Sequence, residues 1–216
     1  MSARMYRGLF AVVAWLALAV QVALAVDGKA GWDVAAAIVR LFSFFTILTN
    51  LLVALAFTGP LLRDHRRLAR WSASEGVRAS VAMYITVVGV IYHLLLAPYW
   101  NPTGWLLVVN VVLHTVTPTA FVLDWLLFTP KGRLRWIDAA KWLGFPLVYG
   151  VWTVAHGLVS GWWPYGFVDP DRIGWGGLGV SLLAFAAFFY ALGLLIVAMD
   201  RVLSRRARRD SAPSAL

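Results

Sequence analysis

The sequence predicts an all-α polytopic membrane protein, a bundle of six transmembrane helices. Hydrophobic residues fill 61% of the 216 positions, charged residues only 13%, and the mean hydropathy is +0.76. A soluble domain typically carries about 25% charged residues, so this composition favours lipid as the solvent. The apolar residues gather in six stretches, each near the roughly 20 residues that a helix needs to cross the hydrocarbon core.

Gly, Pro and charged residues separate the six apolar stretches, as at Gly59-Pro60 and Thr129-Pro130. No connecting segment is long enough for a second domain. We therefore expect one transmembrane domain over residues 1–200 and a basic, disordered cytoplasmic tail over residues 201–216. The six expected helices cover residues 6–26, 38–57, 77–97, 104–128, 142–160 and 178–199.

The positions of the basic residues predict the orientation of the chain. All but three of the 19 Lys and Arg residues lie near the N-terminus, between the second and third or the fourth and fifth stretches, or in the tail; the exceptions are Lys29, Arg40 and Arg172. Because basic loops stay on the cytoplasmic side, we expect both termini in the cytoplasm and the chain in the cell membrane. This distribution also argues against a nucleic-acid partner, despite the formal net charge of +9.

The first apolar stretch leaves a second possibility open. Arg4, Arg7, an apolar run and Ala23-Leu24-Ala25 resemble a signal peptide followed by its cleavage site. The run is longer than the usual roughly 7–15 residues of such a signal, which favours retention as a first transmembrane helix.

Polar residues form stripes on the second to fifth predicted helices when they are placed at 3.6 residues per turn. Such residues are costly in lipid, and we therefore expect these four helices to face a polar interior. The stripes comprise Ser43, Thr46, Thr49 and Asn50; Thr86, Gly89 and His93; Asn110, His114, Thr117 and Asp124; and Tyr149, Thr153, His156 and Ser160.

Depth places two of these side chains in one layer. At a rise of about 1.5 Å per residue, Thr46 lies about 9–15 Å and His114 about 15 Å below the outer boundary. His93 and His156 lie nearer that surface, at about 6–8 Å. Ser and Thr often join helices by hydrogen bonds, and we assign that role to Thr49 and Thr117. Asp124, near the cytoplasmic end, is expected to be a structural anchor or counter-ion.

Three segments carry a family resemblance. They are Phe-Phe-Thr-Ile-Leu at residues 44–48, Asn-Val-Val-Leu-His-Thr-Val-Thr-Pro at 110–118 and Ser-Gly-Trp-Trp-Pro-Tyr at 160–165. In these the chain resembles the androgen-induced-gene-one and ADTRP family of multi-span membrane hydrolases. The resemblance implies the same six-helix layout, an intramembrane threonine nucleophile and a histidine on another helix, which together split esters of hydroxy fatty acids. Thr46 and His114 match those two positions.

The chain departs from the family pattern after the threonine, where Thr49-Asn50 supplies a second hydroxyl and an amide. Thr49 therefore remains an alternative nucleophile. A threonine hydroxyl needs a base within hydrogen-bond reach, and a low-dielectric site favours a neutral imidazole that can accept the proton. Asn50 and Asn110 are expected to orient the pair or to stabilise the oxyanion. The implied partners are the lipid bilayer and a lipid ester that enters from the outer leaflet.

Other function classes compete with the hydrolase. In the hydrolase hypothesis, His93 and His156 are supporting or substrate-binding residues. The alternative is a b-type haem protein, which binds its iron through histidines from different helices, and His93 and His156 are the best such pair. A transporter or a non-catalytic membrane protein would use the polar stripes as contacts between helices. The hydrolase hypothesis itself needs no cofactor and no metal. The absence of cysteine excludes disulfides, thiolate metal sites and cysteine nucleophiles.

Overall fold

A computed structural model describes residues 1–62 and 66–210, with the backbone alone for residues 206–210. The described residues form helices and no strand, which confirms the all-α class. Arg63 and residues 211–216 of the expected tail lie outside the described part. The helices are α1 (Ala3–Val26), α2 (Trp32–Phe42), α3 (Phe45–Thr58), α4 (Arg67–Ala73), α5 (Glu75–Ile91), α6 (Gly104–Val111), α7 (Thr117–Phe128), α8 (Trp136–Lys141), α9 (Gly144–Ser160) and α10 (Pro170–Asp210).

Two further segments are π-helical turns, wider than an α-helical turn. The first, Tyr92–Leu96, continues α5, and the second, Val112–Val116, joins α6 to α7. Three short 3₁₀ turns, Gly59–Leu61, Ala97–Tyr99 and Gly166–Val168, end or connect the longer helices.

Within the described residues, five helical segments are long and apolar enough to cross a membrane: Ala3–Val26, Glu75–Tyr99, Gly104–Phe128, Trp136–Ser160 and Pro170–Arg205. A sixth forms if the pair Trp32–Phe42 and Phe45–Leu61, bent by 75°, is counted as one span. The chain is therefore a helical bundle with the dimensions of a multi-pass membrane protein.

The helix expected over residues 38–57 is not continuous, because the chain breaks at Ser43 and Phe44. The N–H of Ser43 bonds to the carbonyl of Arg40, and its hydroxyl donates to the carbonyl of Val39 at 2.8 Å. Such hydroxyl bonds one turn back commonly bend helices. Phe44 then adopts an extended conformation (φ −86°, ψ 129°) before α3 begins. The break places the start of α3 inside the bundle.

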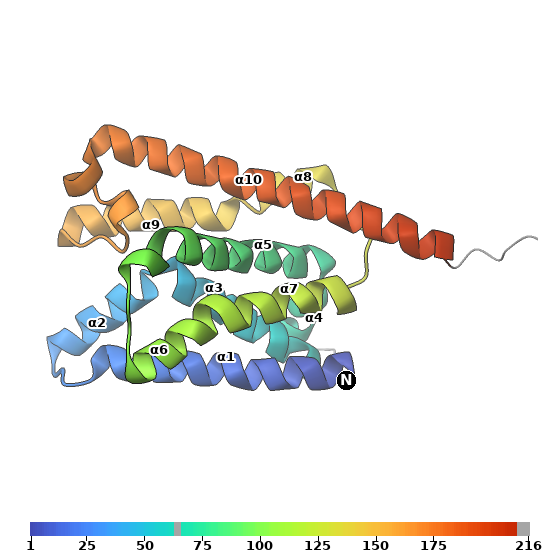
Figure 1. Cartoon of the computed structure of the whole chain (residues 1–216), viewed down its shortest axis with the longest axis horizontal. Helices are drawn as coiled ribbons and strands as arrows, with labels where there is room; N and C mark the ends of the chain where they lie inside the picture. Colours follow the sequence, from blue (N-terminus) through green and yellow to red (C-terminus); the bar gives the residue numbers. More distant parts are fainter. Residues whose placement is uncertain (63–65, 211–216) are drawn as a thin grey trace, which may run out of the picture.

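α5 is the central helix of the bundle. Figure 1 shows α1 along one side and α10 along the opposite side, with α5 between them. Half of the apolar window of the α5 segment is buried, compared with 11% for the segment that contains α9. α5 packs against α3, α7 and α10, and the largest fully buried side chains include Met83 and Ile85 of this helix. α9, in contrast, exposes most of its surface.

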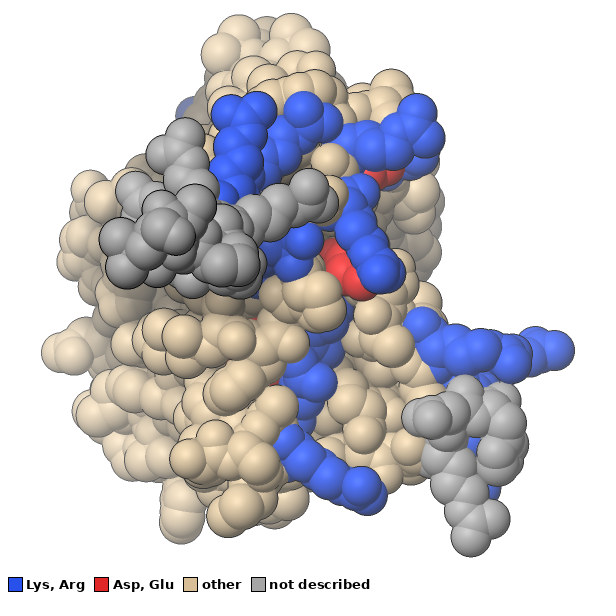
Figure 2. Space-filling model, turned by 90° about the vertical axis from the view of Figure 1, so that its right-hand side faces the viewer, with Lys and Arg blue, Asp and Glu red and all other residues tan. Residues whose placement is uncertain are grey.

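Both ends of the described chain lie at the same end of the bundle (Figure 1). Figure 2 looks onto that end, and Lys and Arg side chains spread over it with few acidic side chains between them. α10 continues as a helix to Asp210 and so includes residues 201–210, for which a disordered tail was expected. The basic segments identified in the sequence thus lie at one end of the molecule.

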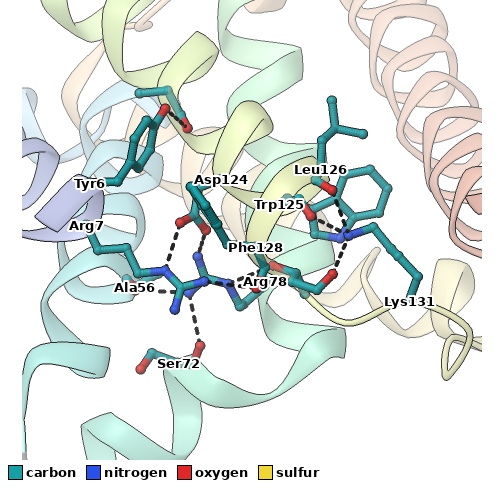
Figure 3. Close-up of polar contacts among 12 residues, drawn as sticks. Tyr6, Arg7, Ala56, Ser72, Arg78, Asp124, Trp125, Leu126, Phe128 and Lys131 are labelled. Carbon is teal, nitrogen blue, oxygen red and sulfur yellow. Dashed lines mark hydrogen bonds and ion pairs between the residues drawn. The ribbon is translucent and has the colours of Figure 1, made fainter. Parts of the chain in front are cut away.

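A buried ion cluster joins three helices at this basic end (Figure 3). Arg7 of α1 donates from Nε to Asp124 of α7 at 2.8 Å, and Arg78 of α5 pairs with the other carboxylate oxygen. Arg78 also donates to Thr129 Oγ1 at 3.0 Å and to the carbonyls of Ala56 and Ser72 at 3.2 Å. Asp124 is fully buried, which agrees with its expected role as anchor or counter-ion.

Candidate functional site

Thr46 lies at the second residue of α3, directly after the break, and its side chain is directed toward His114. Its Oγ1 lies 3.3 Å from His114 Nε2. The histidine belongs to the π-helical turn Val112–Val116 between α6 and α7. The two side chains thus come from segments that are 68 residues apart and meet at the separation, about 3–5 Å, that a resting nucleophile and base require.

The surroundings of His114 fix the tautomer of its ring. Nδ1 lies 3.0 Å from the carbonyl oxygen of Asn110, which can only accept a hydrogen bond. A neutral imidazole carries one proton, so that proton sits on Nδ1 and leaves a lone pair on Nε2. Nε2 can therefore accept the hydroxyl proton of Thr46. The Tyr92 ring stacks on the imidazole at a centroid distance of 4.0 Å and holds its plane.

Asn50 and Asn110 both form hydrogen bonds that hold neighbouring groups of the site in place. The Asn50 amide donates to the carbonyl of Thr46 at 2.9 Å and to that of Leu113 at 3.1 Å, while its oxygen accepts from Thr117 Oγ1. It therefore ties the first turn of α3 to the turn that carries the histidine. The Asn110 amide donates to the Tyr92 hydroxyl. With these bonds formed, the geometry favours the orienting role of the two amides over the alternative of oxyanion stabilisation.

A cavity of about 530 Å³ opens beside Thr46. Its volume lies within the roughly 300–1,000 Å³ typical of ligand pockets. The walls come from α3, α5, α9, α10 and the segment that connects α9 to α10, and most of them are apolar. Polar groups on the lining are few: Thr46, Tyr92, Tyr149, Thr153 and Tyr165. His114 is not among the lining residues, so Thr46 stands between the base and the cavity.

The remaining candidates lie elsewhere. Thr49 is fully buried, does not line the cavity, and its hydroxyl has no hydrogen-bond partner among the described residues. His93 is exposed and its Nε2 lies 3.0 Å from Thr115 Oγ1. His156 packs between Trp152 and Trp162, with ring centroids 5.6 Å away in each case. The structure brings neither His93 nor His156 to the cavity.

Tyr92 and Tyr165 contribute to the site, although the sequence alone did not single them out. Tyr92 directly precedes a candidate histidine, and Tyr165 ends the Trp-Trp-Pro-Tyr segment. Their position beside these residues could have indicated a role in the site. In a chain with 12 Trp, 7 Tyr and 12 Phe residues, however, both rings resemble aromatic residues of the membrane interface. In residues 1–62 and 66–210, no three His, Asp or Glu side chains form a group that could hold a metal ion.

The fold and the site define an all-α bundle with the dimensions of a multi-pass membrane protein and a buried threonine–histidine pair beside an apolar cavity. Comparison with family models, with curated proteins and with solved structures finds no match to this chain. Its function is therefore argued from the site itself.

Proposed function

We propose that this protein is an integral membrane hydrolase that cleaves lipid esters, with Thr46 as the nucleophile and His114 as the base. One observation carries the proposal. The Thr46 hydroxyl lies 3.3 Å from a histidine nitrogen whose lone pair is directed toward it, at the wall of a largely apolar cavity. A nucleophile, a base within reach and a third group that orients the base are the pattern expected for covalent catalysis.

The reaction proceeds in two halves. His114 Nε2 takes the hydroxyl proton while Thr46 Oγ1 bonds to the ester carbonyl carbon, whose π electrons move to the carbonyl oxygen. The tetrahedral intermediate then collapses, the bond to the alkoxy oxygen breaks, and His114 returns the proton to the departing alcohol. Water attacks the acyl-threonine in the same way, with His114 as the base. This second half releases the fatty acid and restores Thr46.

The cavity supports a substrate with a long apolar chain that arrives from the membrane. Leu147, Val151 and Leu158 of α9 line the cavity and are nevertheless 56%, 72% and 62% exposed. A single layer of side chains thus separates the cavity from the lipid-facing surface. Together with the family resemblance, this favours esters of hydroxy fatty acids that enter sideways.

The proposal places the chain in the plasma membrane with both termini on the cytoplasmic side. The gathering of Lys and Arg at the end that carries both termini supports this orientation (Figure 2). Reporter domains that are active only in the cytoplasm, fused to either end, should both be active, and an inactive reporter at either end would contradict the topology.

The test of the function uses the purified protein in lipid vesicles with an ester of a hydroxy fatty acid, such as palmitoyl-hydroxystearic acid. We expect stoichiometric release of the two fatty acids, followed by chromatography and mass spectrometry. Vesicles without protein control for spontaneous hydrolysis. Intact ester after many hours, with folded protein present, would contradict the proposal.

A further inference from the structure

The cavity beside Thr46 is long and follows α9. Its lining includes residues of this helix from Leu143 to Leu158, a length of about 22 Å at a rise of about 1.5 Å per residue. One leaflet of a bilayer has a hydrocarbon region of about 15 Å, half of the roughly 30 Å of the whole core. The cavity is thus long enough for the extended hydrocarbon chain of a membrane lipid.

The lining continues around α9 from its inner side to its exposed side. Tyr149 and Thr153 mark the inner side, because the Tyr149 ring packs on Phe45 of α3 at a centroid distance of 5.1 Å and Thr153 is buried. Leu147 and Leu158 lie about 160–180° around the helix from Tyr149, at about 100° per residue. Both line the cavity and both are exposed. The cavity therefore reaches the surface on the side of α9 that faces away from α3.

Gly150 lies between these two sides and faces α10. It is about 100° around the helix from Tyr149 and lines the cavity. A Cβ atom at this position would lie 3.9 Å from Leu182 Cδ2 of α10, an ordinary van der Waals contact. α10 contributes one face to the same part of the cavity, with Leu182, Phe185, Ala186 and Phe189. Gly150 thus leaves open the part of the cavity that lies between α9 and α10.

Neither packing nor backbone conformation requires glycine at position 150. Gly157, on the same helix, is different, because a Cβ atom there would lie 2.6 Å from atoms of the Trp163 ring. Gly150 meets no such obstacle, and it does not belong to the glycines with positive φ. Glycine weakens a helix relative to alanine. What Gly150 provides in return is space inside the cavity.

We infer that Gly150 is a specificity-determining residue, which keeps a passage between α9 and α10, bounded by Gly150 and Leu182, open for one long acyl chain. The chain lies in this passage with its carbonyl end at Thr46. Its apolar surface contacts the apolar walls, and it enters from the exposed side of α9. The selectivity for long-chain esters rests on the proposed function, whereas occupation of the passage by a fatty acid does not.

The first test replaces Gly150 with Leu, which puts an isobutyl group into the passage. Palmitoyl- and butyryl-hydroxystearic acid differ only in the length of the acyl chain. Each buried methylene contributes roughly fourfold to binding, and the isobutyl group displaces about four of them. We expect the ratio of kcat/KM for the palmitoyl ester to kcat/KM for the butyryl ester to decrease by about 10²-fold. Gly150→Ala adds one carbon and should decrease the ratio by roughly fourfold.

Two further variants control this test. Gly144→Leu is the same substitution on the same helix, at an exposed position outside the cavity lining, and should keep the wild-type ratio. Ala186→Leu fills the passage from α10 and should lower the ratio as Gly150→Leu does. It serves as the test if Gly150→Leu does not fold. Thermal unfolding of each variant checks its folding.

A second measurement does not depend on turnover. A palmitic acid that carries a diazirine in its chain is added to the protein in phosphatidylcholine vesicles and activated by light. In the wild type we expect adducts on Val88 or Phe189, which line the cavity and are 4% and 5% exposed, so that bilayer lipid does not reach them. Gly150→Leu should lose these adducts. Adducts on Leu183, exposed on α10 and outside the lining, should be kept.

The outcomes separate the two proposals. If the wild type hydrolyses the esters and folded Gly150→Leu keeps the wild-type ratio or the adducts on Val88 or Phe189, the passage is overturned and the hydrolase stands. If the wild type hydrolyses neither ester but Gly150→Leu loses those adducts, the passage stands and the proposed function fails. If the wild type shows neither hydrolysis nor adducts on Val88 or Phe189, both fail.

Discussion

Replacing Thr46 with Ala should reduce lipid-ester hydrolysis to the background rate while the fold is retained. The substitution removes the proposed nucleophilic oxygen, which lies 3.3 Å from His114 Nε2. In membrane bundles an interhelical hydrogen bond contributes only about 0.6 kcal/mol on average, so the folded protein should survive its loss. The measurement is the rate of fatty acid release in vesicles, with circular dichroism and thermal unfolding as checks of folding.

His114→Ala should be nearly as inactive, because a nucleophile and its base act as one unit. For the same reason the double variant should be little slower than either single variant. Thr49→Ala is the matched control: it removes a buried hydroxyl one turn further along α3 and away from the cavity lining. We expect it to keep substantial activity. Wild-type rates in folded Thr46→Ala would contradict the mechanism. Loss of activity in Thr49→Ala alone would indicate that Thr49, one turn further along α3, is the nucleophile.

The largest effect on stability is expected for Asp124→Ala. Asp124 is fully buried between Arg7 and Arg78, whose side chains are 15% and 3% exposed. Removing the carboxylate leaves two guanidinium groups inside the bundle without a counter-ion (Figure 3). Breaking a buried ion pair typically costs about 3–5 kcal/mol, so the midpoint of thermal unfolding should fall steeply, or the protein should fail to accumulate.

Glu75→Gln is the control for this prediction, because Glu75 pairs with Arg133 at 3.0 Å on the surface, where the arginine side chain is 75% exposed. Exposed pairs contribute about 0–1 kcal/mol, and this variant should unfold close to the wild-type temperature. Equal midpoints for Asp124→Ala and Glu75→Gln would show that the buried cluster does not hold α1, α5 and α7 together.

Much of the fold follows from the sequence because lipid imposes simple demands. Apolar stretches of near-constant length predict the helices, and the alternation of basic segments predicts that the ends of the chain share one end of the bundle. The break at Ser43 could not be predicted, because neither Pro nor Gly is present there. The hydrogen bonds that Tyr149 and Trp152 of α9 donate to Ser43 join positions more than 100 residues apart, which no local pattern indicates.

The site was predictable only in part, for a similar reason. Depth along two helices and the family resemblance selected Thr46 and His114, and the structure places these two side chains together. The bonds of Asn50 depend on the exact approach of α3 to the π-helical turn of His114. Tyr165 reaches the cavity because the segment after α9 folds back over it. Neither feature leaves a periodic pattern in the sequence.

The most direct test of the account is to locate the covalent adduct that an ester-mimicking fluorophosphonate forms with the wild-type protein. Mass spectrometry of the digested, labelled protein should find a single modified side chain, Thr46, and labelling should be lost in His114→Ala because no base then activates the hydroxyl. An adduct on Thr49 or on any other side chain, or no adduct on folded protein that hydrolyses the ester, would contradict the assignment of Thr46 as the nucleophile.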